Sequence, residues 1–307
     1  MLSVFYRESN IILNELEYNF NLFKKVHTLT LLDCNVLKIT NAGNLRKTLH
    51  KLNAAKCGLR HVSEMLMCDS VHRDLAEMEQ ETLATLPKWS HLRDLNISYN
   101  NISSIDISIS LCNRLETIDL SGNQLTGLDY LTKLPYLISV VVSNNAIVEL
   151  SDLHTKLGNL VHLDLSRNKM QSLVGLACLY SLVSLDVSCN LIYDVSEVRH
   201  VSKLPCLEDF ILTGNPVSMI VDYRTKVLES FGLRSSEVCL DNERPTQREL
   251  DKVAVLQALR AARENKALPS LNIASPLQIT RHSLSTAPPP VTFTDLATAV
   301  EEATKLD

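Results

Sequence analysis

The sequence predicts an α/β solenoid, a stack of short parallel strands joined by longer outer segments. The first observation is a spacing of apolar residues, apolar-x-x-apolar-x-apolar-x-x-Asn, which the stretch from Leu160 to Asn168 fits. The second is that this spacing recurs in six units in a row. The third is the period of 22 or 23 residues between most units. That period leaves room for a strand and one short helical turn, and a full α-helix does not fit.

The apolar positions of each unit form its predicted core. In a short strand, alternate side chains point to opposite faces, so these residues point inward. They are Leu92, Leu95 and Ile97; Leu115, Ile118 and Leu120; Leu137, Val140 and Val142; Leu160, Leu163 and Leu165; Leu182, Leu185 and Val187; Leu207, Phe210 and Leu212. This pattern is typical of a leucine-rich repeat solenoid with short helical segments on its convex side.

An asparagine closes each unit. Its side chain can satisfy the buried backbone amides of the bend that follows the strand. The predicted structural ladder consists of Asn100, Asn123, Asn145, Asn168, Asn190 and Asn215. Two more degenerate units precede these six, and they carry Cys34 and Cys57 in the asparagine position.

The N-terminal part of the chain is predicted to cover the open end of the array. A solenoid's first unit lacks a neighbour on one side, so a helical cap is expected over residues 1–25. The apolar residues at helical spacing there are Ile12, Leu16, Phe20 and Phe23. The repeats should occupy residues 26–215, with an irregular acidic helical insertion at about 60–91. The acidic residues of this insertion have two interpretations, a solvated helix face or a docking site.

Three segments are predicted after the repeats: a C-terminal repeat cap at 216–241, a separate helix at 242–266 and a disordered tail at 267–307. Apolar residues at helical spacing predict a helix within the cap, with Gly232 at its end. Thr246 and Glu249 form a capping box at the start of the separate helix. The Ser-, Thr- and Pro-rich composition of the tail is typical of disorder.

Composition and motifs exclude several classes of function. A net charge of −5 and a pI near 6.0 argue against nucleic acid or an anionic membrane as the main ligand. We expect no direct membrane insertion, because no apolar run is long enough, and a cytoplasmic protein with reduced cysteines. No catalytic, cofactor-binding or metal-binding motif is found, so we expect a non-enzymatic protein without cofactors.

The exposed strand positions predict a concave surface, which solenoids use to bind partners. The candidate partner-binding residues are Asp94, Asn96, Asp119, Val141, His162, Asp164, Asp186, Asp209 and Ile211. Their aspartates predict an acidic strip that favours a basic partner segment. Leu-Asp-Leu-Ser is also a common repeat sequence, so a purely structural interpretation stays open. Val141 and Ile211 are the predicted hot spots, and His162 is predicted to be a surface contact rather than a metal ligand.

The end of the array resembles the nischarin family of imidazoline-receptor-related proteins. The matching stretches are Leu153-His-Thr-Lys-Leu-Gly-Asn159, Leu204-Pro-Cys-Leu-Glu208, Asp222-Tyr-Arg-Thr-Lys-Val-Leu228 and Ser236-Glu-Val-Cys-Leu-Asp241, with the helix that contains Glu249-Leu-Asp251. The resemblance implies a cytosolic and endosome-associated scaffold that binds an integrin α-subunit cytoplasmic tail. It also implies restraint of Rac GTPase and p21-activated kinase signalling in cell migration. The phox-homology domain of that family is not expected before residue 26.

An alternative function is a leucine-rich repeat regulatory subunit that directs a phosphatase or a kinase to its substrates. Both functions use the array to bind another protein. They differ in whether a catalytic subunit accompanies the chain, and this difference can be tested by co-purification.

Overall fold

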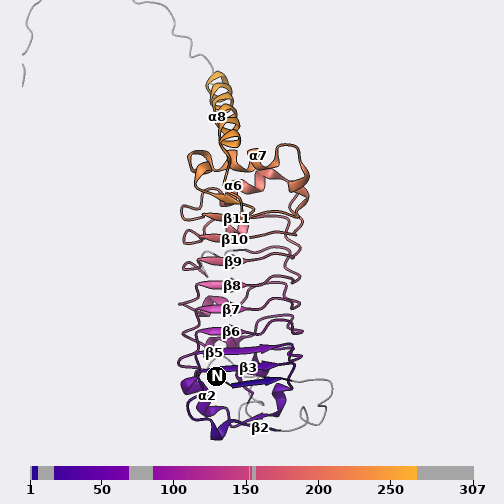
Figure 1. Cartoon of the computed structure of the whole chain (residues 1–307), viewed down its shortest axis with the longest axis vertical. Coiled ribbons are helices and arrows are strands. Elements are labelled where there is room, and N and C mark those ends of the chain that lie inside the picture. The colour runs from indigo at the N-terminus through magenta and orange to yellow at the C-terminus, as the bar shows by residue number, and fades with distance from the viewer. Residues whose placement is uncertain (1, 6–16, 69–85, 152, 154–156, 268–307) are drawn as a thin grey trace, which may run out of the picture. The chain divides into compact units, whose positions relative to one another are not determined.

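The computed structural model describes residues 2–5, 17–68, 86–151, 153 and 157–267. In this part of the chain the main feature is a ten-stranded parallel sheet in the order β1-β3-β5-β6-β7-β8-β9-β10-β11-β12, seen as a ladder of strands in Figure 1. The strands are β1 (Leu2–Phe5), β3 (Thr28–Leu32), β5 (Lys51–Ala55), β6 (Asp94–Asn96), β7 (Thr117–Asp119), β8 (Ser139–Val141), β9 (His162–Asp164), β10 (Ser184–Asp186), β11 (Asp209–Ile211) and β12 (Cys239–Leu240). The predicted leucine-rich repeat fold is confirmed.

Each three-residue strand from β6 to β11 buries only its central residue. In β6, Leu95 is buried while Asp94 and Asn96 face the opposite side and stay partly accessible. All the apolar positions predicted for the six units are buried, and they belong to one continuous hydrophobic core. The alternation of side chains along a strand therefore places one set in the core and leaves the other set as the exposed face of the sheet.

Short helical segments form the other side of the coils, as the 22- to 23-residue period predicts. They are η5 (Ile107–Leu111), η6 (Leu131–Lys133), η7 (Val174–Leu176), η8 (Val195–Glu197) and α6 (Val198–Val201). Asp106 and Asp194 immediately precede η5 and η8, and each accepts a hydrogen bond from the backbone amide two residues later. A side-chain acceptor at this position satisfies an amide that has no partner within the helix.

The ladder asparagines connect consecutive coils. Oδ1 of Asn168 accepts the amide of Ile147 at 3.1 Å, and Nδ2 donates to the carbonyls of Val142 and Leu165 at 2.9 Å each. Equivalent bonds are made by Asn100, Asn123, Asn145, Asn190 and Asn215. The sequence predicted bonds to the bend that follows each asparagine. The amide instead belongs to the bend of the preceding coil, because stacking places that bend beside the side chain.

Cys57 performs part of the same role in a degenerate unit. Its thiol donates to the carbonyls of Ala55 and Leu31, the second of which lies in the preceding coil. Burial raises the pKa of the Cys57 thiol to about 11, so the group keeps the proton that it donates. A thiol cannot replace the amide's two donors and carbonyl oxygen together.

The N-terminal cap differs from the predicted helix. Over residues 17–25 the backbone forms β2 (Tyr18–Asn19) and η2 (Phe20–Leu22), and β2 pairs with β4 (Ile39–Thr40). Residues 6–16 lie outside the described residues. Further along are η3 (Val36–Lys38), α2 (Gly43–Thr48) and α3 (Ser63–Leu66). The acidic helix predicted in the insertion falls mainly on residues 69–85, which are also outside the described part, and residues 86–91 form no helix.

The C-terminal cap contains η9 (Pro216–Met219), α7 (Tyr223–Ser230), η10 (Gly232–Ser236) and strand β12, which pairs with β11. Gly232 follows α7 with φ of +61°, a left-handed conformation that favours glycine at a helix end. The separate helix is α8 (Gln247–Ala267). Its capping box is present: the amide of Thr246 donates to Glu249 Oε2 at 2.8 Å, and the amide of Glu249 donates to Thr246 Oγ1 at 3.4 Å.

Residues up to Arg263 form one compact unit. Of the second unit, Glu264–Asp307, the structure describes the backbone of 264–267, which continues α8. The tail predicted to be disordered therefore lies almost entirely outside the described residues.

Gly175 in η7 packs directly against the backbone of the preceding coil. A Cβ atom at this position would lie 1.6 Å from the carbonyl oxygen of Leu150, so the backbone must move to accept any side chain. We expect Gly175→Ala to lower the free energy of unfolding by about 2 to 3 kcal/mol, measured by urea denaturation. Gly127→Ala is the control, because its Cβ would meet only Asp129 Oδ2 at 3.7 Å. Equal effects of the two substitutions would contradict the close approach.

Candidate functional site

The exposed strand side chains form rows because the parallel strands are in register. The central row contains Asn53, Asn96, Asp119, Val141, Asp164, Asp186 and Ile211. The N-terminal row contains Lys51, Asp94, Thr117, Ser139, His162, Ser184 and Asp209. We call these two rows the polar sheet face. It carries all the predicted partner-binding residues, but not as one strip, because Val141 separates Asp119 from Asp164 in the central row.

The aspartates of the central row also hold the backbone. Oδ1 of Asp164 accepts the amide of Ser166 at 2.8 Å, and Oδ1 of Asp186 accepts the amide of Ser188 at the same distance. Asp119 makes the same bond to Ser121 and also accepts a bond from the Asn96 amide group at 3.1 Å. These bonds satisfy amides at the point where each strand ends. The Leu-Asp-Leu-Ser sequence thus has a structural reason. The negative charge of the same carboxylates can also act on a binding partner.

Asp186 in the central row has a raised pKa. Partial burial raises its pKa, and the nearby negative charges of Asp164 and Asp241 act in the same direction, against the bonds from Ser188. Because the native pKa lies above the unfolded one, protonated Asp186 contributes stability at low pH. This contribution is lost as the pH rises through the native pKa. At neutral pH the charged carboxylate therefore destabilises the fold.

Asp186→Asn is expected to stabilise the protein at pH 7. The amide oxygen can keep the bond to Ser188, as Asn96 does with Ser98 at 2.9 Å, while the repulsion from Asp164 on the neighbouring strand disappears. The expected gain is about 0.2 to 1 kcal/mol, the range for a like-charge pair across two strands. Scanning calorimetry should show a higher Tm at pH 7 and no difference at about pH 3, where both forms are neutral. A gain that persists unchanged at low pH would contradict this explanation.

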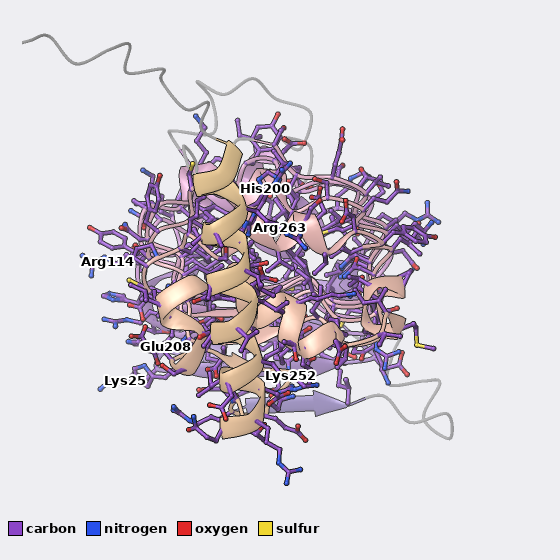
Figure 2. All side chains as sticks on the ribbon, turned by 90° about the horizontal axis from the view of Figure 1, so that it is seen from above. Lys25, Arg114, His200, Glu208, Lys252 and Arg263 are labelled. Carbon is purple, nitrogen blue, oxygen red and sulfur yellow. The ribbon has the colours of Figure 1, made fainter. Side chains whose placement is uncertain are left out.

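A rim of larger side chains borders the polar sheet face at the N-terminal ends of β6 to β8. Tyr136 is 61% exposed. With Arg93, Arg114 and Glu116 it lines a hollow of 290 Å³, in which Arg93 and Glu116 form an ion pair of 2.9 Å; Arg114 extends outward from the coils (Figure 2). None of these residues is among the predicted partner-binding residues, because they stand outside the strand positions from which that prediction was made. The available signal in the sequence was a tyrosine and two arginines just before strands.

One coil carries an apolar group across this surface. Tyr136 and Ile138, which is 41% exposed, lead into β8, and Val141 is half-buried at the end of that strand. The hot spots predicted from sequence were Val141 and Ile211, and Ile211 lies next to Asp186 in the central row. The β8 coil therefore adds exposed Tyr136 and Ile138 to Val141 of the polar sheet face, and the coils on either side of it contribute Asp119 and Asp164 to the central row.

His162 is exposed in the N-terminal row, between Ser139 and Ser184. Within the described ranges, no three His, Cys, Asp or Glu side chains are grouped closely enough to hold a metal ion. Among the helices that the structure describes, none has both the length and the apolar composition needed to cross a membrane.

Comparisons with known proteins agree with this architecture. Residues 86–203 match a family model described as leucine-rich repeat. The serine/threonine-protein kinase 11-interacting protein of Gallus gallus is 31% identical over 134 residues, which are 38% of this chain and 12% of that protein. A leucine-rich repeat protein of Leptospira interrogans superposes with a TM-score of 0.52 at 16% identity, over 82% of this chain and 62% of the other.

The stacked parallel strands and the matched segment together show a leucine-rich repeat fold. Arrays of this kind present extended surfaces for binding other proteins. The finer resemblance to nischarin stays a prediction.

Proposed function

We propose that this chain is a non-enzymatic protein-interaction module that binds its partner on the polar sheet face. The observation that carries the proposal is the apolar group of the β8 coil, Tyr136, Ile138 and Val141, between the coils of Asp119 and Asp164. Exposed aromatic and aliphatic side chains act as anchors in interfaces. Flanking carboxylates favour Lys and Arg in the partner and repel acidic segments. The expected ligand is therefore a segment with an apolar anchor between basic residues.

The nischarin resemblance supplies a more specific proposal for the partner. The ligand would be the cytoplasmic tail of an integrin α subunit, and the complex would restrain Rac GTPase and p21-activated kinase during cell migration. The protein would act in the cytoplasm and in association with endosomes. The acidic residues of the central row support a ligand of basic character, and the nischarin-like stretches around Asp222 to Leu228 support this particular partner.

A charge-only variant tests the polar sheet face. The triple substitution Asp119→Asn, Asp164→Asn and Asp186→Asn removes three negative charges and keeps an oxygen acceptor for each backbone amide. We expect affinity for a fluorescein-labelled integrin α-subunit tail peptide to fall about tenfold or more, since close charge pairs across an interface contribute about 1.5 kcal/mol or more. Fluorescence anisotropy at low and moderate salt measures the loss.

The matched control removes the same charge elsewhere. Asp129→Asn, Glu149→Gln and Glu243→Gln replace three exposed acidic residues outside the polar sheet face. This variant should bind as the wild type does. If the peptide binds but both triple variants lose affinity equally, only net charge matters and the face is not the site. If the peptide does not bind at all, the integrin proposal is wrong.

A second candidate function is a regulatory subunit that directs a kinase to its substrates. The observation that favours it is the similarity to the Gallus gallus protein, whose name describes an interaction with serine/threonine-protein kinase 11. Tagged chain purified from cells would then carry a kinase or a phosphatase in stoichiometric amount, detectable by light scattering and mass spectrometry. Purification of the tagged chain without such a subunit would favour the scaffold.

A further inference from the structure

The first half of helix α8 (Gln247–Ala267) packs against and pairs with the C-terminal cap, and further along the helix Arg260 lies 3.9 Å from Glu229 of α7. Val253 is buried, Glu249 pairs with Arg224 at 2.7 Å, and Lys252 pairs with Asp222 at 3.2 Å. Two other apolar residues of the same helix, Val255 and Leu259, are 59% and 52% exposed. These two residues are four positions apart and so share one face of the helix. The helix is therefore anchored to the cap and still exposes an apolar face to solvent.

The exposed face borders a groove between α7 and α8. One end of the groove has a volume of 440 Å³, and its lining residues are Asp222, Thr225, Lys226, Asp251, Lys252, Val255 and Leu256. A recess of this size accepts side chains of a bound segment. Figure 2 looks down on the cap and shows Lys252 toward one end of α8 and Arg263 toward the other.

The groove becomes basic at its other end. A second hollow, of 630 Å³, lies between α6, α7 and α8, and its cationic lining residues are Arg199, Lys203, Lys226 and Arg260. Lys226 lines both hollows, so they are adjacent. The acidic residue at the basic end is Glu229, 3.9 Å from Arg260. Among the described residues, Arg199, Lys203 and Lys226 form no ion pair. Positive charge therefore collects here in a chain whose net charge is −5.

We infer that this cap groove, lined by α6, α7 and α8, binds an acidic amphipathic helix of a partner protein. Apolar residues spaced three or four apart on the ligand would pack against Val255, Leu256 and Leu259. Carboxylates further along the same ligand would meet Arg199, Lys203 and Lys226. The polar sheet face favours basic segments, so the two surfaces select ligands of opposite charge. This second surface goes beyond the proposed function and does not depend on it.

An anionic membrane is the competing ligand for a basic and apolar helix. The geometry favours a protein segment. Val255 and Leu256 line a recess, whereas insertion into lipid requires apolar side chains to protrude.

Selection from a displayed library of random 16-residue peptides against the full chain tests the inference. The enriched peptides should combine apolar residues at i and i+4 with several Asp or Glu. Synthetic versions should bind the wild type in a salt-dependent manner and lose at least tenfold in affinity with Lys226→Glu or Val255→Asp. Both residues are exposed, so the fold should persist, which circular dichroism can verify.

Matched controls locate the effect. Lys88→Glu reverses an exposed charge elsewhere, and Leu233→Asp replaces a side chain that is 96% exposed outside the groove. Both should bind the selected peptides as the wild type does. Enrichment of no peptide, enrichment of peptides without acidic residues, or equal losses in all four variants would overturn the inference. So would sedimentation with vesicles containing phosphatidylserine that is lost with Lys226→Glu, because it would identify a membrane as the ligand.

Discussion

Asn168→Ala is expected to lower the free energy of unfolding by about 3 kcal/mol, a large effect for one polar side chain. The substitution removes bonds to four backbone groups: the amide of Ile147 and the carbonyls of Val142, Leu165 and Ser166. The carbonyls of Val142 and Leu165 keep bonds from Asn145 and Asn190, but the amide of Ile147 loses its acceptor. A buried group left unsatisfied costs about 1 to 3 kcal/mol, and each further lost bond costs about 0.5 to 1.5 kcal/mol. Asn168 itself is only 7% exposed, so water replaces it poorly. Urea denaturation followed by circular dichroism measures the loss.

Asn159→Ala is the matched control for this prediction. Asn159 is exposed and makes one long bond, 3.4 Å, to the carbonyl of Pro135. Its replacement should change stability by less than about 0.5 kcal/mol. If the two alanine variants have similar stability, the ladder does not hold the coils together in the way that its geometry indicates.

Trp89→Ala should cost about 3 to 5 kcal/mol, the range for removing a large buried aromatic side chain. Trp89 is fully buried, and its Nε1 donates to the carbonyl of Leu66 at 3.1 Å. The guanidinium of Arg46, also buried, lies 5.8 Å from the ring centroid and donates to the same carbonyl at 3.2 Å. The variant would therefore create a cavity and remove an aromatic contact of a buried cation.

Trp89→Phe separates packing from the hydrogen bond. It keeps an aromatic ring near Arg46, and Leu66 retains the Arg46 donor, so the expected loss is about 1 to 2 kcal/mol. Trp89 is the only tryptophan of the chain, so circular dichroism is the suitable probe for both variants. Equal losses for the alanine and phenylalanine variants would contradict the role assigned to the ring.

The repeats could be predicted from sequence because their physical cause is local and periodic. Leu163 is buried and its strand neighbours are not, as the alternation of side chains requires. Thr246 and Glu249 form the predicted capping box for the same reason, since all its bonds lie within four residues. The partner of a ladder residue such as Asn168 depends on which bend stacks beside it, and spacing alone does not contain that information.

The helix predicted for the N-terminal cap was wrong over residues 17–25, because two apolar residues three positions apart are compatible with several backbone structures. Phe20 is buried and Phe23 is 39% exposed, yet the backbone between them is a single 3₁₀ turn. Pairing of Tyr18 with Ile39 competes with helix formation, and this contact joins residues distant in sequence. The sequence also left the role of the central-row aspartates open. An aspartate that binds a backbone amide and an aspartate that binds a partner are the same residue in the sequence.

Partners that bind on the polar sheet face beside the β8 coil should be captured by photo-crosslinking in cells. Benzoylphenylalanine replaces Tyr136 in one variant and Tyr193 in another. Both tyrosines are exposed, at 61% and 65%, but Tyr193 follows the ladder residue Asn190 beyond the other end of its strand. We expect a discrete crosslinked partner from position 136 and none from position 193. Crosslinks from position 193 alone would contradict this expectation.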